Sequence, residues 1–397
     1  MDKKIFQVYL AKRDVPDSEA YAQLDLPALP WELIDALDKV RLAGDETLFL
    51  EIEDYYDYEE LLPHLAEEVI SLNELNALAQ SLSELSSGQH TAFDGLLQME
   101  VDKRTGPISV QTLRNLAASA DCCHVVGEAL NDSQLGRFYA ENGFIPEIEN
   151  LPDKVFEMLD FEAIGRKMRL GDCGVFTPHG YVAQNADLEL TSPVPADVLA
   201  PNYSILLRVS KGYFNDPAYD NDKTVLLKLP AGPEQVDAVV EELGAASWKE
   251  LGWRCLDCRV PTLADAITDA EDFAAVDLLA KKLMDMETKN IPRYKAVLSA
   301  TDCKDISQAL QYAESLDQYI LSPGISGPRE LARQEVELMA SDKDVELLLK
   351  HLNLYAYGRE LLEQDPAILT EYGLLERQDG EPIQRLDQPA QGGMKMR

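Results

Sequence analysis

The sequence predicts an α+β fold arranged as two similar units in tandem. Short runs that alternate apolar and polar side chains, as strands do, are interleaved with runs of helical periodicity. In addition, residues 161–182 align without gaps on residues 354–375, so one pattern of elements recurs. The length of 397 residues agrees with more than one domain.

The first half opens with elements that return in the second half. Residues 24–37, LDLPALPWELIDAL, and residues 227–239, LKLPAGPEQVDAV, each predict a strand end, a break at Pro and the start of an amphipathic helix. Residues 48–54, LFLEIED, predict a strand with one buried face, followed by an acidic turn. Apolar positions then recur at a constant offset of 201 residues, which relates Leu75, Leu78, Ala79, Leu82 and Phe93 to Val276, Leu279, Ala280, Leu283 and Tyr294.

The ends of the two halves align best. Each end predicts an amphipathic helix with a Gly-Arg pair, a short apolar strand, a turn closed by Gly and a final strand. The aligned pairs are Gly165 and Arg166 with Gly358 and Arg359, Thr177 with Thr370, and Gly180 with Gly373. We therefore predict one unit over residues 1–190, a Pro-rich linker over 191–202, a diverged unit over 203–378 and a flexible polar tail over 379–397.

The charge balance is strongly acidic. Asp and Glu number 71 against 36 Lys and Arg, a formal net charge of -35 at pH 7, and residues 1–200 hold 37 of the acids but 14 of the bases. Nucleic acid is excluded as a direct partner, because binding phosphates needs clustered Lys and Arg. Two explanations stay open: the acidity keeps the protein in solution, or it fits a partner with a basic cleft.

The acidic residues are placed in two blocks. Between Arg41 and Lys103 there is no Lys or Arg, while Asp and Glu occur fifteen times. A second block from Glu128 to Glu162 is opposed only by Arg137 and Lys154. Within it, the spacing of Glu149, Asp153, Glu157 and Asp160 predicts one acidic helix face, where like charges destabilise a helix. A plain solvated face is the alternative interpretation.

The candidate partner-binding residues are the carboxylates of these two blocks. They are Asp45, Glu46, Glu51, Glu53, Asp54, Asp57, Glu59, Glu60, Glu67, Glu68, Glu128, Asp132, Glu141, Glu147, Glu149, Asp153, Glu157 and Asp160. We expect Tyr55, Tyr56 and Tyr58, which interleave with them, to divide between core and surface.

The sequence gives little support for a catalytic or metal-binding site. Cys255 and Cys258 form a lone CxxC without a second pair, which favours two partly buried thiols over a redox or metal site. The five histidines lack HxxxH or HExxH spacing, and Asp216, Asp220 and Asp222 lack the Gly and Glu of an EF-hand loop. Phosphate-binding loops and a nucleophile elbow are also missing. We expect neither a metal, nor a cofactor, nor enzymatic activity.

The chain is expected to be cytoplasmic with reduced thiols, because it has few cysteines and its N-terminus does not resemble a signal peptide. No apolar run approaches the roughly 18 residues that a membrane helix needs. Arg166 and Arg359, at equal places in the two halves, are expected to bind backbone carbonyls or nearby carboxylates.

Several segments over residues 5–185 resemble the ArdA antirestriction family, in the order in which that family has them. They are FQVYLAKRD, LDLP followed by an acidic helix, SLNELNALAQSL, LGRFYAENGFIPEIENLP and FEAIGRKMRLGDCGVFTPHGYV. The resemblance implies an elongated chain of small α/β subdomains that forms a dimer and whose surface carboxylates imitate bent B-DNA. It also implies binding in the DNA channel of a type I restriction-modification enzyme, through the methyltransferase and specificity subunits, without a cofactor.

The charge of the first half agrees with this interpretation, since its 23 excess negative charges match roughly 40 Å of duplex as an upper bound. The second half is less acidic and lacks the Tyr that follows the last Gly of the first half. The second half either takes the place of the second protomer of a dimer, or it has another role in binding proteins or as a scaffold. We expect a monomeric pseudo-dimer rather than a homodimer. A CRISPR nuclease or another DNA-binding defence enzyme is the alternative target, and a CxxC-dependent redox or metal enzyme is the alternative class.

Overall fold

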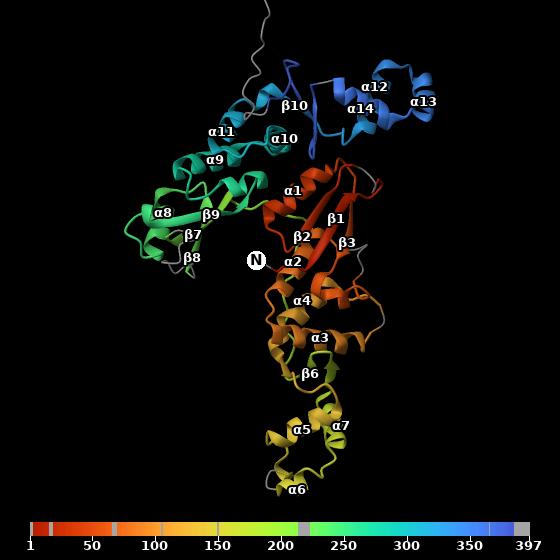
Figure 1. The fold of residues 1–397 in the computed structure, drawn as a ribbon, viewed down its shortest axis with the longest axis vertical. Coiled ribbons are helices and arrows are strands. Elements are labelled where there is room, and N and C mark those ends of the chain that lie inside the picture. Colours follow the sequence, from red (N-terminus) through yellow and green to blue (C-terminus); the bar gives the residue numbers. More distant parts are fainter. Residues whose placement is uncertain are drawn as a thin grey trace, which may run out of the picture. The chain divides into compact units, whose positions relative to one another are not determined.

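The computed structural model describes residues 3–15, 19–65, 70–104, 106–148, 151–212, 223–364 and 366–384. Helices and small three-stranded sheets are mixed along the chain (Figure 1), which confirms the predicted α+β class. Residues 385–397 of the predicted tail, and the Asp-rich segment of residues 213–222, lie outside the described residues. In the part of the chain described, no helix combines the length and the apolar character needed to span a membrane.

The first half contains six named strands and seven named α-helices within the described residues. The strands are β1 (Phe6–Lys12), β2 (Ala22–Leu26), β3 (Leu48–Asp54), β4 (Cys123–Val126), β5 (Val175–Thr177) and β6 (Gly180–Gln184). The helices are α1 (Pro30–Val40), α2 (Leu72–Ser83), α3 (Ser87–Val101), α4 (Val110–Ala118), α5 (Asp132–Glu141), α6 (Asp153–Phe156) and α7 (Phe161–Asp172). Short 3-10 helices are η1 (Tyr56–Leu61), η3 (Ala120–Cys122) and η4 (Pro146–Ile148).

The second half has a similar set of elements. Its strands are β7 (Ile205–Lys211), β8 (Thr224–Leu229), β9 (Leu251–Cys258), β10 (Tyr319–Ser322), β11 (Ile368–Thr370) and β12 (Gly373–Arg377). Its helices are α8 (Pro233–Glu242), α9 (Phe273–Asp285), α10 (Ile291–Thr301), α11 (Ile306–Glu314), α12 (Pro328–Met339), α13 (Asp342–His351) and α14 (Leu354–Gln364). The 3-10 helices are η5 (Trp248–Glu250), η6 (Pro261–Ala266), η7 (Thr288–Asn290) and η8 (Leu316–Gln318).

The order of elements in the first half recurs in the second. The sheet order β2-β1-β3, with α1 before its last strand, corresponds to β8-β7-β9 with α8. The later sheet β4-β6-β5 corresponds to β10-β12-β11, and both are antiparallel. The equivalent apolar positions on α2 and α9, which include Leu75 and Val276, are fully buried. A common origin of the halves stays a prediction, but their connectivity is the same.

The aligned glycines and threonines have physical roles that explain why they recur. Gly165 on α7 and Gly358 on α14 each pack so closely on a neighbouring helix that an added Cβ would collide with a backbone carbonyl. In the hairpin that follows, the Thr177 hydroxyl donates to the carbonyl of Gly180 at 3.0 Å. Gly180 has a φ of +146°, a conformation that a residue with a side chain rarely adopts.

The chain forms two compact units whose boundaries do not follow the halves of the sequence. The first comprises residues 1–8, 25–27 and 50–197, and the second residues 9–24, 28–49 and 198–397. The change from one to the other near residue 197 falls inside the segment predicted as a linker. The second unit also includes α1, which the sequence-based division assigned to the first half. The predicted boundaries at 190 and 203 stay a prediction.

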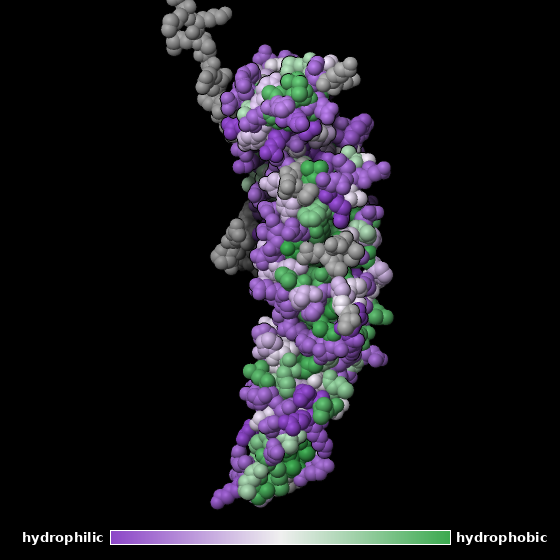
Figure 2. All heavy atoms as spheres, turned by 90° about the vertical axis from the view of Figure 1, so that its right-hand side faces the viewer, coloured by the Kyte–Doolittle hydropathy of each residue, from purple (hydrophilic) through white to green (hydrophobic). Residues whose placement is uncertain are grey.

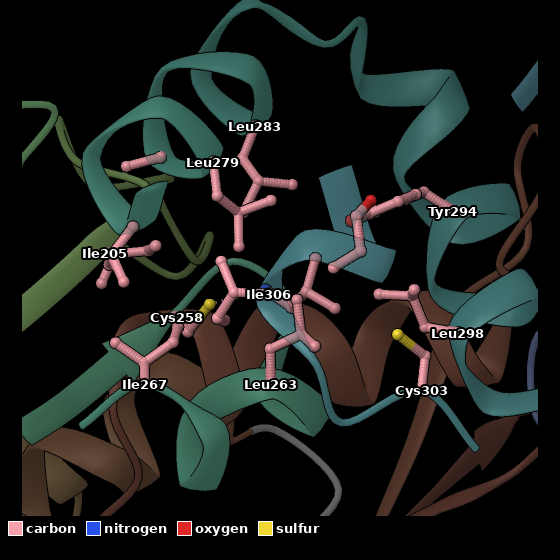
Figure 3. Packing of buried hydrophobic residues seen from close by; sticks show 14 of the residues in the cluster. Ile205, Cys258, Leu263, Ile267, Leu279, Leu283, Tyr294, Leu298, Cys303 and Ile306 are labelled. Atoms are coloured by element: carbon pink, nitrogen blue, oxygen red, sulfur yellow. Dashed lines mark hydrogen bonds between the residues drawn. The ribbon is translucent and has the colours of Figure 1, made fainter. Parts of the chain in front are cut away.

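A large hydrophobic core holds the second compact unit together. Side chains from β7, η6, α9, α10 and α11 point toward one another in it (Figure 3), and most are fully buried. Helix α1 belongs to this unit through polar contacts as well. The Trp31 indole donates to the carbonyl of Tyr203 at 3.0 Å, and the Tyr372 hydroxyl donates to Asp35 at 2.8 Å. The buried Lys295 ammonium lies 2.7 Å from the carboxylates of both Asp35 and Asp38.

Candidate functional site

The first group of candidate carboxylates lies on β3 and on the segment that follows it. Leu50 and Ile52 are buried while Glu51 and Glu53 are exposed, so the alternation predicted for this strand is confirmed. Asp54 is also exposed and accepts a hydrogen bond from the backbone of Tyr56 at 2.7 Å. A strand held by a buried face thus presents acidic side chains at regular spacing on its other face.

The acidic turn predicted after this strand is the 3-10 helix η1. Asp57, Glu59 and Glu60 are exposed on it, whereas Tyr58 is fully buried and its hydroxyl donates to the carbonyl of Leu82 at 3.0 Å. This bond attaches η1 to the end of α2. Tyr55 is also buried and Tyr56 is 37% exposed, which confirms that the tyrosines divide between core and surface.

Several carboxylates of the first block have cations beside them. The Lys3 ammonium lies 3.5 Å from Asp57, within the first compact unit. Asp45 and Glu46 are exposed between α1 and β3, in the second compact unit, and Glu46 pairs with Lys12 at 2.9 Å. The hydrogen bond from Lys12 holds the pKa of Glu46 below its usual value.

The second group of carboxylates lies on and around the helix pair α5 and α7. These helices lie side by side (Figure 1). They pack most closely at Gly136 and Gly165, where an added Cβ would collide with the facing backbone. The small residues allow the backbones to approach closely, so the acidic side chains are carried on a tightly packed pair. The exposed members of the group are Glu128, Glu141, Glu147, Asp153, Glu157 and Asp160, and Asp132 is partly buried.

Arginines neutralise part of this second group. The Arg169 guanidinium donates to both oxygens of Asp132, at 2.8 and 3.1 Å, and this bond lowers the pKa of Asp132. Arg137 binds Glu157 at 2.9 Å and Glu141 at 3.1 Å. The count of acids in the sequence therefore overstates the charge that this group offers to a partner.

The prediction of one acidic helix face from Glu149 to Asp160 is wrong. Helix α6 ends at Phe156, so Asp153 begins it and Glu157 follows its last residue. Asp160 is the N-cap of the next helix, α7, and accepts a hydrogen bond from the backbone of Ala163 at 3.0 Å. The spacing was compatible with one helix, but the chain breaks between α6 and α7. A capping carboxylate is stabilised by free N–H groups rather than repelled by its neighbours.

Three candidates, Glu67, Glu68 and Glu149, lie outside the described residues. On the surface around α5, α6 and α7, hydrophobic and hydrophilic atoms are intermingled (Figure 2). Met158, between α6 and α7, and Leu170 on α7 are among the exposed apolar residues there. This surface therefore offers apolar contact area beside its carboxylates, as interfaces between proteins do.

Residues 22–183 match the family model described as Antirestriction protein (ArdA). We refer to residues 22–183 as the ArdA segment, after the family model that they match. It runs from β2 to β6 and includes both groups of carboxylates. The match confirms the resemblance seen in the sequence, while the second half lies outside it. A search among curated proteins found no match to the chain.

The CxxC pair lies outside the ArdA segment, on β9. Cys255 is partly buried and Cys258 is buried, as expected, with the Cys258 sulfur among the apolar side chains of the second unit (Figure 3). The hydrogen bond with Cys258 and burial both raise the pKa of the Cys255 thiol. A reactive or metal-binding cysteine needs the thiolate, so this environment acts against either role.

The paired arginines bind carboxylates, as expected. Arg166 of the ArdA segment lies 2.5 Å from Glu162, one helical turn earlier, and Arg359 lies 3.5 Å from Glu363. Sequence reasoning did not predict the ion pairs of Arg137 with Glu157 and of Arg169 with Asp132, because these partners are distant in sequence. It also treated the histidines as scattered, whereas His64, His90 and His179 line one cavity of the ArdA segment.

Proposed function

We propose that the protein is a non-enzymatic DNA mimic that inhibits a type I restriction-modification enzyme. In this proposal, carboxylates of the ArdA segment occupy the channel in which the methyltransferase and specificity subunits bind DNA. The observation that carries the proposal is the display of exposed carboxylates on β3, η1 and the α5–α7 pair, within the segment that matches the ArdA family.

The way in which these side chains are held supports mimicry. On β3 and η1, buried neighbours such as Ile52 and Tyr58 fix the backbone, so the backbone that carries the carboxylates loses little freedom on binding. Basic side chains that bind DNA phosphates attract carboxylates by the same Coulomb interaction, and long-range steering favours fast association. The ion pairs of Asp132 and Glu157 reduce the available charge, so the footprint is shorter than the roughly 40 Å estimated from the sequence.

The proposal is tested by capture of partners from cells that carry defence systems. Tagged full-length protein should recover the methyltransferase and specificity subunits, and added duplex DNA should release them. Recovery of a CRISPR nuclease or another DNA-binding defence enzyme would retain mimicry and change the target. A partner that stays bound in the presence of saturating DNA would contradict mimicry.

We further propose that the chain is a monomer in which the second half takes the place of a partner protomer. The recurrence of the element order, from β1–β6 in the first half to β7–β12 in the second, supports this. A chain that already contains two related units has less need of a second copy to form a twofold arrangement.

A further inference from the structure

A cavity of about 240 Å³ lies in the first compact unit, between η1, α3 and the turn that joins β5 to β6. Acidic and imidazole side chains line much of it. Glu60 comes from η1, His90 and Asp94 come from α3, and His179 comes from the hairpin turn. Residues from three separate parts of the sequence thus meet around one space, which HxxxH or HExxH spacing could not have indicated.

The ligand atoms of Glu60, His90 and Asp94 are close enough to share one ion. One imidazole nitrogen and two carboxylate oxygens, one from each residue, all lie within 4.8 Å of one another. His90 Nδ1 is 3.7 Å from a carboxylate oxygen of Asp94, one helical turn further along α3. The ring of His179 lies 6.5 Å from that of His90, centre to centre. Atoms bound to one ion at about 2.0–2.2 Å are separated by up to about 4 Å, so small side-chain movements would complete the site.

Two of these polar groups lack the partners that buried groups normally have. Among the described residues, His90 Nε2 and Asp94 Oδ1 are shielded from solvent and neither has a hydrogen-bond partner. Leaving such a group unpaired costs free energy of about 1–3 kcal/mol. The Glu60 carboxylate lies close to that of Asp94, so two negative charges meet at this point. A bound cation would offset the repulsion between the carboxylates of Glu60 and Asp94.

We propose that Glu60, His90 and Asp94 bind a divalent transition-metal ion of the Zn²⁺ or Co²⁺ type. An imidazole nitrogen beside carboxylate oxygens favours these ions over Mg²⁺ and Ca²⁺, which prefer oxygen ligands alone. The ion would join η1, which carries the exposed Asp57 and Glu59, to the helix α3 beneath it. The bound ion would therefore hold η1 against α3. The proposal does not depend on which enzyme the carboxylates of η1 bind.

Cobalt titration of the full-length protein, freed of metal by chelation, tests the site. Absorption spectroscopy should show one Co²⁺ bound per chain without the intense charge-transfer bands of thiolate ligands, and Zn²⁺ should displace it. Asp94→Asn and His90→Gln should each weaken binding by at least about tenfold. His351→Gln on α13 and Cys255→Ser should bind as the parent protein does, because neither residue contacts the cavity.

Thermal unfolding separates loss of the site from loss of the fold. Asn has the size of Asp and removes a buried charge, so metal-free Asp94→Asn should unfold at or above the temperature of the metal-free parent. Added Zn²⁺ should raise the unfolding temperature of the parent and leave that of Asp94→Asn unchanged. The proposal is overturned if the parent binds no Co²⁺, or if binding is lost in Cys255→Ser and kept in both cavity variants.

Discussion

Lys295 is a fully buried lysine on α10 that lies between the carboxylates of Asp35 and Asp38. Burial acts to raise the pKa of Asp35, but the charges of Lys295 and Lys39 outweigh it and lower that pKa. For Asp38 burial prevails, and its pKa is raised. The Lys295 ammonium thus compensates both carboxylates, and Lys39 adds a second cation at Asp35.

Replacing this lysine should destabilise the second unit in a pH-dependent way. Lys295→Met should lower the free energy of unfolding by about 3–5 kcal/mol at about pH 8, because the partly buried Asp38 loses its cation and the buried Asp35 keeps only Lys39. Without Lys295, burial raises the pKa of Asp38 further and acts to raise the pKa of Asp35. The loss of stability therefore grows as the pH rises above the carboxyl pKa of the unfolded chain. It becomes smaller as the carboxyl groups take up protons toward about pH 4.

Urea denaturation followed by tryptophan fluorescence measures this loss, since Trp31, Trp248 and Trp253 all belong to the second compact unit. Lys304→Met is the control, because Lys304 is exposed and its removal should change stability by less than about 0.5 kcal/mol. An equal loss at both pH values would contradict the role assigned to Asp35 and Asp38.

At the scale of elements, the crossing of α5 and α7 depends on glycines that have no room for a side chain. Gly165→Ala should destabilise this helix pair by about 1–3 kcal/mol or more, since the added methyl meets backbone atoms of Asp132 and Gly136. Gly171→Ala, on the same helix but with open space around it, should be neutral or stabilise by up to about 1 kcal/mol. Hydrogen exchange of peptides from α5 and α7 reports the difference, and similar exchange in both variants would refute it.

The acidic face of β3 and η1 should contribute more to inhibition than acidic residues of the second half. Two variants with equal changes of charge compare them, one at Glu51, Glu53, Asp57 and Glu59 and the other at Asp265, Asp269, Glu271 and Asp272, each to Gln or Asn. We expect the first to weaken inhibition of the restriction enzyme by about tenfold or more and the second to have little effect. Glu60 is left unchanged so that the proposed metal site stays intact. Equal losses of inhibition would instead indicate that the carboxylates of both halves bind the restriction enzyme.

At the scale of the whole molecule, inhibition should be competitive with DNA and should weaken with salt. Both ligands would use the same Lys and Arg of the target, and the screening length falls from about 10 Å at 0.1 M salt to about 3 Å at 1 M. Inhibition of DNA cleavage is measured at increasing DNA and at increasing ionic strength. An inhibition constant that does not change with either would argue against a mimic.

The assembly state is a second property of the whole molecule. Light scattering at micromolar concentration should give a mass near the 44.2 kDa of one chain, as expected if the second half replaces a partner protomer. A mass near twice that value would show that the chain still dimerises.

The sequence by itself determined the features that depend on local spacing. Alternation along β3 predicted which side chains of LFLEIED face outward, and the aligned Gly-Arg and Thr-Gly positions predicted matching helix, strand and hairpin elements at residues 161–182 and 354–375. Periodicity is a property of neighbouring residues, so it can be read without knowledge of the fold. It failed where a helix had to end, at Phe156, because that break is not visible in the spacing of the acids.

Only the tertiary structure decided which charged residues that are distant in the sequence form ion pairs. Arg169 pairs with Asp132, 37 residues away, and Lys295 pairs with Asp38, 257 residues away, and no local pattern predicts either contact. The same holds for the cavity, where Glu60 of η1 meets His90 and Asp94 of α3. Of its three ligands, only the spacing of one helical turn between His90 and Asp94 could be seen in advance. Ion pairs and metal ligands depend on distances through space, and packing of the apolar core sets those distances.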